Sequence, residues 1–444
     1  MGRRRAGKGI SSFQIIILGF WGLVLFGTLL LMLPAAVRAG ESHTFEEALF
    51  TATSAVCVTG LVIKDTAQHW SFFGQAVILV LIQIGGLGIV TVAAFFAMVS
   101  GRKISLLQRT TLQDSLSAHQ VGGMVRMTYF IFKTAFCMEF VGAVSMMPVF
   151  CKKYGPYGIW MSVFHAVSAF CNAGFDIMGD KSGAFSSLTA FGSDPGIVLP
   201  VCLLIILGGI GFLTWSDVAE HKLQVHRYRM QTKVILITTM FLILLPAAAL
   251  YLWEYAAYGG KERILLSLFQ AVTPRTAGFN TADLTQLTGV GRMLLISLML
   301  IGGSPGSTAG GMKTTTLAVL LANALSVFRR RKNTQLFSRR VEEGTIKSAS
   351  TLLTMYLLLT LAGAAVISMT EGIPVGTCIF ETASAIGTVG LSLGITPSLH
   401  PLSHMVLVLL MYFGRVGGLT LIYAAMSSRS AEVSQRPVEK ITVG

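Results

Sequence analysis

Long apolar segments, separated by short polar or basic stretches, run along nearly the whole 444-residue chain. A helix of about 20 apolar residues is long enough to cross the hydrocarbon core of a bilayer. The pattern predicts eight crossing helices, at about residues 13–36, 74–100, 125–150, 196–218, 232–255, 291–326, 349–370 and 403–427. The first segment is too long for the apolar part of a cleavable signal peptide, and no small-residue cleavage site follows it. We therefore expect an all-α integral membrane protein with a single membrane domain over residues 1–444.

One short pattern returns in each quarter of the chain, between two apolar segments. It consists of Phe, a Ser or Thr four residues later, and then a small or β-branched residue, Gly and an apolar residue; the copies begin at Phe50, Phe164, Phe269 and Phe380. The segment leading into each loop is too short to span a bilayer, so we expect a re-entrant half-helix, which is tolerated only when buried in protein or lining a water-filled cavity. The pattern predicts four repeats of helix, half-helix, loop and helix, at about 13–101, 125–222, 232–330 and 347–428.

Four such loops at one axis would suit the passage of a cation. Dehydrating a cation requires several oxygens from different directions, and each half-helix would direct the partial negative charge of its carboxyl end toward the centre. A glycine just past a helix end is also a common helix cap, but four copies at equivalent positions favour a pore with pseudo-fourfold symmetry. The expected ion-binding filter residues are Val58, Thr59, Gly60, Asn172, Ala173, Gly174, Thr276, Ala277, Gly278, Thr388, Val389 and Gly390.

The filter loops match only the central part of the longer TVGYG loops of potassium channels. We therefore expect a shorter filter with fewer fully defined ion sites. Three carboxylates follow the loops, namely Asp65, Asp176 and Asp283. They would either ring the outer mouth and concentrate cations there, or be ordinary solvated loop carboxylates.

The sixth apolar segment is interrupted at its centre. Residues 302–311 contain five glycines and one proline, which cannot hold a continuous helix, and broken backbone at membrane depth implies a cavity or a gate. Two cations, Lys313 and Arg415, lie in apolar context and could bind the carbonyl groups of this segment. Lys313 could instead extend toward the cytoplasm. The expected gate residues are Gly302, Gly303, Ser304, Gly306, Gly310, Gly311, Lys313 and Arg415.

Composition and charge agree with a membrane protein and argue against a nucleic-acid partner. Charged residues make up 12% of the chain, about half the usual share of a soluble domain. The formal net charge is +14, but most Lys and Arg residues fall in segments that are cytoplasmic if the amino terminus is cytoplasmic, as the positive-inside rule requires. We expect both termini on the cytoplasmic side and the four filter loops on the outer side. The six cysteines show no paired spacing, so we expect no metal site of His and Cys ligands and no disulfide framework.

Two other classes of function are less favoured. A secondary transporter of a polar solute would normally have inverted halves and carboxylates within its helices, whereas the repeats here are parallel and Glu139 is the clearest mid-helix acid. An enzyme would need a nucleophile–base pair or a metal cluster, and the eight histidines are scattered along the chain. We therefore expect a transport protein and no enzyme activity.

Five glycine-containing motifs extend the pattern beyond the filter. They are Gln83-Ile-Gly-Gly-Leu-Gly88, Gly208-Gly-Ile-Gly211, Pro274-Arg-Thr-Ala-Gly-Phe-Asn280, residues 302–316, and Gly414-Arg-Val-Gly-Gly418. With the four loops, they resemble the Trk/Ktr/HKT superfamily of potassium uptake proteins, and within it the KtrB-type membrane subunits. The resemblance runs from about Phe13 to Met426, although the third repeat has one residue fewer between its Thr273 and Gly278.

The resemblance implies K⁺ uptake across the cell membrane, with K⁺ bound at the filter residues and Na⁺ as a stimulating ion. It also implies a homodimer with one pore in each subunit, surrounded by membrane lipid. Control would come from a cytosolic ring of nucleotide-binding, RCK-type regulatory subunits, with the nucleotide on the ring and not on this chain. The basic stretch at 329–340 and the short terminal tails, residues 1–11 and 427–444, are the sizeable cytoplasmic surface that the sequence offers. We expect the ring to dock on the basic stretch.

Overall fold

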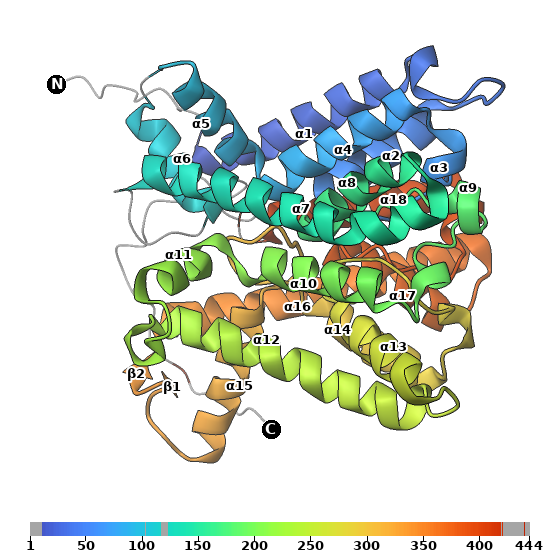
Figure 1. Cartoon of the computed structure of the whole chain (residues 1–444). Helices are drawn as coiled ribbons and strands as arrows, with labels where there is room; N and C mark the ends of the chain where they lie inside the picture. Colours follow the sequence, from blue (N-terminus) through green and yellow to red (C-terminus); the bar gives the residue numbers. More distant parts are fainter. Residues whose placement is uncertain (1–10, 103, 117–122, 419, 421–438, 440–444) are drawn as a thin grey trace.

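The computed structural model describes residues 11–102, 104–116, 123–418, 420 and 439. The predicted terminal tails and the end of the eighth predicted helix lie almost wholly outside these residues. The described part is almost entirely helical (Figure 1).

The helices of the first two quarters are α1 (Ser12–Leu31), η1 (Pro34–Ala36), α2 (Phe45–Cys57), α3 (Thr66–His69), α4 (Phe72–Leu87), α5 (Ile89–Val99), α6 (Leu106–Leu116), α7 (Met124–Tyr154), α8 (Tyr157–Phe170), α9 (Gly179–Ser182), η2 (Thr189–Phe191), α10 (Pro195–Ile210), α11 (Phe212–His221) and η3 (Val225–Arg227). The elements of the last two quarters are α12 (Met230–Ala249), η4 (Leu250–Glu254), α13 (Gly260–Val272), η5 (Leu284–Gln286), α14 (Gly289–Leu300), α15 (Thr314–Phe328), β1 (Gln335–Leu336), β2 (Arg339–Arg340), α16 (Glu343–Glu371), α17 (Val375–Gly387), η6 (Thr396–Ser398) and α18 (Pro401–Val416).

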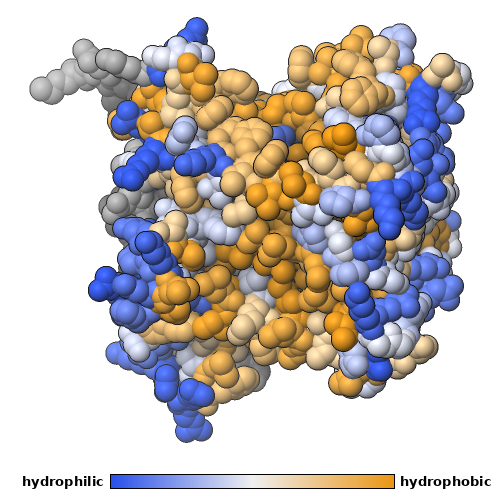
Figure 2. Space-filling view, viewed as in Figure 1, coloured by the Kyte–Doolittle hydropathy of each residue, from blue (hydrophilic) through white to orange (hydrophobic). Residues whose placement is uncertain are grey.

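Four helical spans among the described residues are long and apolar enough to cross a membrane by themselves. They are α1, α7, Met230–Glu254 and α16. An apolar band covers the middle of the visible face, and hydrophilic residues gather toward the two ends that α11 and α9 mark in Figure 1 (Figure 2). This arrangement is that of a multi-pass membrane protein. The predicted segments at 291–326 and 403–427 contain shorter helices, α14, α15 and α18.

Two segments predicted as continuous crossing helices, at 74–100 and 196–218, are bent. The axes of α4 and α5 meet at 97° and those of α10 and α11 at 94°. Each bend falls on one glycine, Gly88 with φ +86° or Gly211 with φ +99°, and glycine adopts such a backbone conformation without the steric cost that a Cβ would bring. The continuous-helix prediction is therefore wrong for these segments. Gly417, with φ +89° and ψ 131°, repeats this conformation after α18.

The carboxyl-terminal parts of the four half-helices α2, α8, α13 and α17 lie in the interior. Residues 48–57 of α2 are all buried, while the long helix α7 exposes Phe136 and Phe140 on its outer face. The amino end of α2 is fixed by a capping box, in which the Thr44 hydroxyl accepts from Glu47 N and the Glu47 carboxylate accepts from Thr44 N. Such a cap fixes where the half-helix starts. The half-helices are thus held in place by the longer helices around them.

A small departure from the all-α prediction lies between α15 and α16. There β1 and β2 pair as a short antiparallel hairpin, with Phe337 and Ser338 at positive φ. The sequence did not predict this turn, because its central residues, Phe337 and Ser338, are not the Asn-Gly or Asp-Gly pair that usually marks such a hairpin.

Candidate ion pathway

The hydroxyl residue of the repeated pattern fastens the loop that follows its half-helix. We call residues 58–60, 172–174, 276–278 and 388–390 the glycine loops. In the first and fourth repeats the Ser hydroxyl accepts a backbone N–H, and in the second and third the hydroxyl donates to a carbonyl oxygen. The four bonds are Gly60 N to Ser54 Oγ (3.0 Å), Gly390 N to Ser384 Oγ (3.0 Å), Ser168 Oγ to Phe175 O (2.7 Å) and Thr273 Oγ1 to Phe279 O (2.7 Å). The third repeat keeps this bond despite its missing residue.

The four glycine loops meet in a closed ring. A Cβ atom added to Gly60 would clash with the Ala173 carbonyl of the second repeat. The same relation continues around the axis and returns to its start: Gly174 meets Ala277 O, Gly278 meets Val389 O, and Gly390 meets Thr59 O. Each loop therefore abuts the next one, and glycine is required because backbone occupies the space of a side chain.

Each glycine loop also contains a non-glycine residue in a left-handed conformation. These residues stand two positions before the glycine, at Val58 (φ 58°), Asn172 (φ 58°), Thr276 (φ 74°) and Thr388 (φ 51°). Positive φ is uncommon for any such residue and unfavourable for β-branched ones. Such backbone strain is typical of functional sites, where the surrounding structure maintains it.

Four side-chain oxygens of the glycine loops are buried and lack a hydrogen-bond partner among the described residues. They are Thr59 Oγ1, Asn172 Oδ1, Thr276 Oγ1 and Thr388 Oγ1. A buried polar atom without a partner is costly and calls for an explanation such as an ion or water. One such oxygen comes from every repeat.

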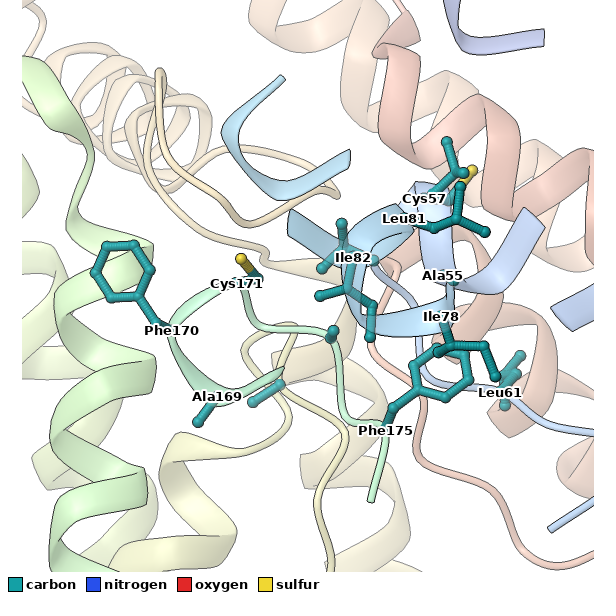
Figure 3. Packing of buried hydrophobic residues seen from close by; sticks show 14 of the residues in the cluster. Ala55, Cys57, Leu61, Ile78, Leu81, Ile82, Ala169, Phe170, Cys171 and Phe175 are labelled. Atoms are coloured by element: carbon teal, nitrogen blue, oxygen red, sulfur yellow. The ribbon is translucent and has the colours of Figure 1, made fainter. Parts of the chain in front are cut away.

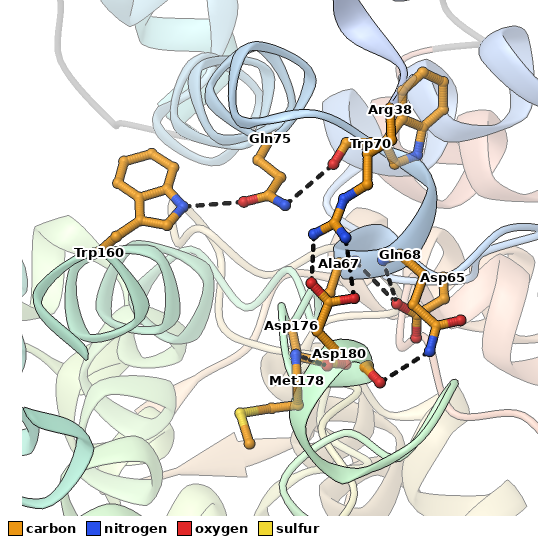
Figure 4. A network of polar contacts seen from close by, with 11 residues as sticks. Arg38, Asp65, Ala67, Gln68, Trp70, Gln75, Trp160, Asp176, Met178 and Asp180 are labelled. Carbon is orange, nitrogen blue, oxygen red and sulfur yellow. Dashed lines mark hydrogen bonds and ion pairs between the residues drawn. The ribbon is translucent and has the colours of Figure 1, made fainter. Parts of the chain in front are cut away.

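A cavity of about 160 Å³ lies on one side of the ring and is lined by all four loop glycines. Asp65 and Asp176 also line it, and both are labelled in Figure 4, where dashed lines mark the hydrogen bonds of the Asp65 carboxylate. Asp65 accepts from Ala67 N, Gln68 N and, at 2.7 Å, from Phe185 N. These bonds fix the carboxylate at the wall of the cavity.

The predicted ring of three aspartates is not formed. Asp283 does not line the cavity; it is exposed and caps η5, accepting from Thr285 N at 2.9 Å. The prediction for Asp283 rested only on its spacing from Gly278 along the chain. In the structure Asp283 instead caps the short helix η5 that follows the third loop. For Asp283 the alternative interpretation, an ordinary solvated carboxylate, describes the structure.

Residues 301–313 form an extended loop between α14 and α15, as the glycine and proline content predicts. We call it the 301–313 loop. Its two ends lie side by side, because Gly302 N donates to Met312 O at 2.7 Å. Its middle is bonded to the bend between α10 and α11: Ser304 N donates to Gly209 O at 2.9 Å, and Phe212 N donates to Gly306 O at 2.7 Å.

The 301–313 loop touches the glycine loops directly. Thr308 Oγ1 donates to Phe170 O at 3.0 Å and accepts from Asn172 Nδ2 at 3.1 Å. A Cβ on Gly310 would clash with Thr388 Oγ1. The loop therefore lies against the second and fourth glycine loops on the side away from the 160 Å³ cavity.

Both cations in apolar context bind backbone carbonyls. Lys313 Nζ donates to Ala309 O at 2.8 Å and to Gly310 O at 3.3 Å. Arg415 donates to Thr308 O in the loop and to Gly85 O and Gly86 O at the end of α4. These charge-assisted bonds tie the loop to the first and fourth repeats.

A second cavity, of about 230 Å³, lies on the other side of the 301–313 loop. Gly306, Lys313 and Arg415 line it, together with residues of the α4–α5 bend and of α6, and no glycine-loop residue does. The glycine loops and the 301–313 loop therefore separate two cavities. Among the described residues no cluster of three or more His, Cys, Asp or Glu side chains could hold a metal ion, and the six cysteines are free.

Comparison with known proteins places this geometry in a family. Residues 11–435 match the TrkH family, described as a cation transport protein. The chain belongs to the TrkH family of cation transport proteins. The predicted superfamily is thereby confirmed, as is the expectation of a transport protein rather than an enzyme.

Several relatives match along nearly their full length. The chain is 39% identical to the potassium/sodium uptake protein NtpJ of Enterococcus hirae, over 100% of this chain and 99% of that protein. It is 34% identical to the Ktr system potassium uptake protein B of Bacillus subtilis, over 95% and 94%. The crystal structure of the potassium transporter TrkH from Vibrio parahaemolyticus superposes with a TM-score of 0.74 at 17% identity, over 96% of this chain and 87% of that one. This likeness supports the fold of a helical membrane transporter.

Proposed function

We propose that this chain takes up K⁺ across the cell membrane, with the four glycine loops as its selectivity filter. The observation that carries the proposal is the closed ring of four loops with one unpartnered buried oxygen from each repeat. A dehydrated cation needs oxygens from several directions, and in this proposal the four loops of the ring would provide them. The names of the relatives, which are potassium or potassium/sodium uptake proteins, support K⁺ as the substrate.

The filter ions would be bound mainly by backbone carbonyls of Val58, Thr59 and Gly60 and of the equivalent residues in the other three loops. The half-helices α2 and α17 end directly at their glycine loops, and at most three residues separate the ends of α8 and α13 from theirs. The partial negative charge of four helix ends would therefore act on the site. The carboxylates of Asp65 and Asp176 would raise the cation concentration in the 160 Å³ cavity, which we assign to the outer side.

The 301–313 loop would serve as the gate beneath the filter. It stands between the two cavities, and Lys313 and Arg415 hold it there through carbonyl bonds. Ions could pass only when the loop moves, and its glycines permit a second arrangement at low cost. Both termini would face the cytoplasm, since that orientation satisfies the positive-inside rule.

A homodimer, with a cytosolic ring of nucleotide-binding regulatory subunits, would complete the system. The Bacillus subtilis relative is named as a protein of a Ktr system, and such a name supports a further component beside the membrane chain. The nucleotide would bind to the ring, and Na⁺ would stimulate or accompany K⁺ uptake, as the name of the Enterococcus hirae relative suggests.

The direct test is transport by the purified chain. Proteoliposomes containing it should accumulate radioactive Rb⁺, and K⁺ should compete better than Na⁺. Expression should also restore growth of a K⁺-uptake-deficient strain at low external K⁺. If the reconstituted protein, with and without a regulatory subunit, moves no Rb⁺ above empty liposomes, K⁺ uptake is not its function.

Docking of the regulatory ring is testable on the basic stretch. Arg329, Arg330 and Arg331 are exposed at the end of α15, and none forms an ion pair among the described residues. Reversing all three to Glu is expected to reduce co-purification with the ring by about tenfold, because surface charge complementarity governs such association. Reversal of the exposed Lys222 and Arg227 is the matched control and should leave it unchanged. Equal loss in both variants would place the contact elsewhere.

The outer cavity predicts a dependence on external pH. Burial raises the pKa of Asp176 to about 7, and the nearby Asp65 carboxylate adds to the rise. Because the carboxyl group is charged only above that pKa, its attraction for cations is lost as external pH falls through about 7. Acidification from pH 8 to pH 6 should raise the KM for Rb⁺ roughly fivefold, the effect of about 1 kcal/mol between nearby charges. The Asp176→Asn variant should lack this dependence, whereas Asp283→Asn should retain it; a dependence kept by Asp176→Asn would contradict the assignment.

A further inference from the structure

Among the described residues, the middle of one long membrane-spanning helix holds a buried acidic side chain without a cationic partner. Glu139, in the middle of α7, is 5% exposed, and no Lys, Arg or His forms an ion pair with it among the described residues. Its carboxylate oxygens accept from one group, the Gln83 side-chain amide, at 2.9 and 3.2 Å. A buried acid in a membrane helix is costly and points to a functional role.

Gln83 links this acid to a glycine loop of another repeat. Its Nε2 donates to Glu139, and its Oε1 accepts from the Cys171 thiol at 3.5 Å. Both Glu139 oxygens lie within 3.2 Å of Gln83 Nε2, which turns the Oε1 of that amide toward Cys171. Glu139 thereby determines that Cys171 meets an oxygen acceptor and not the amide nitrogen.

Cys171 is the residue directly before Asn172, which has the strained φ of 58° in the second glycine loop. In Figure 3 it lies on the side of the α8 end that faces α4, while the neighbouring Phe170 points away. The thiol fills a notch on α4 that exists because residue 86 is glycine: a Cβ there would lie 2.7 Å from Cys171 Sγ. The thiol is therefore held on one side by packing and on the other by the Gln83 amide.

We propose that Glu139 is a positioning residue of the filter, acting through Gln83 and Cys171 to fix the second glycine loop. The chain of contacts crosses from α7 of the second repeat to α4 of the first and back to the end of α8. These contacts thus hold the second glycine loop against the preceding repeat. The inference rests on the proposed function, because it assigns the loop a part in cation selection.

The bond between Glu139 and Gln83 would restrict the second glycine loop to one position. Asn172 also bonds to Thr308 of the 301–313 loop, so a small shift of Cys171 would move a residue that touches both the filter ring and the gate. Replacing Glu139 by Gln removes the group that fixes the Gln83 amide, while keeping the size of the side chain. The Gln83 amide could then take two orientations next to the second glycine loop, in place of one.

The experiment compares the KM for Rb⁺ with the KM for Na⁺ in proteoliposomes of the full chain. Glu139→Gln is expected to lower the Na⁺-to-Rb⁺ ratio of KM values roughly fivefold, an effect of the size found along coupled side-chain networks. Cys171→Ala should have a similar effect, and adding Glu139→Gln to it should change nothing further. Cys171→Ser keeps a donor for Gln83, so this variant should retain the wild-type ratio and its sensitivity to Glu139→Gln.

The control is Asp217→Asn, which alters another buried carboxylate, 2% exposed, that accepts from Arg229 N and forms an ion pair with the Arg229 side chain. It should leave the ratio unchanged. A role of Glu139 in packing alone predicts the same change in the Cys171→Ala and wild-type backgrounds, and that result, or an unchanged ratio in Glu139→Gln, overturns the proposal. If Glu139→Gln protein is not recovered, equal ratios for Cys171→Ala and Cys171→Ser overturn it. Absence of Rb⁺ transport by the wild-type protein would instead reject the proposed function.

Discussion

Replacing Gly278 by serine is expected to lower Rb⁺ uptake at least about tenfold and to weaken the discrimination against Na⁺. The φ of Gly278 is +80°, a conformation that costs other residues about 1–3 kcal/mol. Its Cα also abuts the fourth glycine loop, so that a Cβ would clash with Val389 O. The serine would therefore strain its own loop and displace the neighbouring one.

The ring geometry extends this prediction to the glycines of the other three loops. Each glycine contacts the carbonyl of the next loop, and Gly390 closes the ring on Thr59. Any of the four serine variants should impair selectivity, because the displaced carbonyls are the expected ion ligands. Uptake of radioactive Rb⁺ and of Na⁺ into proteoliposomes measures the effect.

A glycine of the same repeat provides the control. Gly289, at the start of α14, is exposed and has no atom within 4 Å of a built Cβ, so Gly289→Ser should transport as the wild type does. Unchanged affinity and selectivity in a normally expressed Gly278→Ser protein would remove Gly278 from the filter.

The parts of the pathway that depend on local chain chemistry could be predicted from the sequence. The glycine pattern and its hydroxyl residue fall within about a dozen neighbouring residues in each repeat. The break in the sixth segment follows from its glycine and proline content alone. The structure brings the predicted loop residues into one ring and sets the 301–313 loop against it.

The bends at Gly88 and Gly211 were missed because hydropathy does not report direction. Apolar residues continue on both sides of each bend, from α4 into α5 and from α10 into α11, so the pattern is that of one long helix. The signal was present in the Gly-Gly-x-Gly spacing before each bend. At Gly211 the reason is tertiary, since a Cβ there would approach Pro305 O of the 301–313 loop to 2.6 Å.

The left-handed residues before the loop glycines could not be predicted either. Val58 and Thr388 are β-branched and locally disfavour positive φ, so only the packing of the assembled ring maintains it. The same holds for the link from Glu139 to Cys171, which joins residues of three helices. Such contacts exist only after the repeats have come together.

The second large effect is expected from shortening the 301–313 loop. Removing residues 306–311 is expected to raise Rb⁺ flux about tenfold or more and to reduce its dependence on the regulatory partner. The deletion takes away Thr308 and Gly310, the residues that lie against the second and fourth glycine loops. It also removes several carbonyl acceptors of Lys313 and Arg415, and each lost hydrogen bond contributes about 1 kcal/mol to the closed arrangement.

The ends of the loop make the deletion structurally feasible. Gly302 N already bonds to Met312 O, so a shortened connection can join α14 to α15 without separating them. Arg415→Gln is the point variant that tests the same idea, since it removes the charge-assisted bonds to Thr308 O and to the end of α4. Its flux should rise in the same direction but by less, because Lys313 still holds Ala309 O and Gly310 O.

Transport measured with and without the regulatory partner separates this gate from a loop that only props the helix halves apart. A prop predicts lost expression or lost flux, whereas a gate predicts raised flux with the Rb⁺-to-Na⁺ preference kept. The preference itself is the internal control, because Gly60, Gly174, Gly278 and Gly390 remain in place. A deletion variant that stays fully dependent on the partner would reject the gate, and the closed arrangement would then have to be enforced by another segment, such as the bends at Gly88 and Gly211.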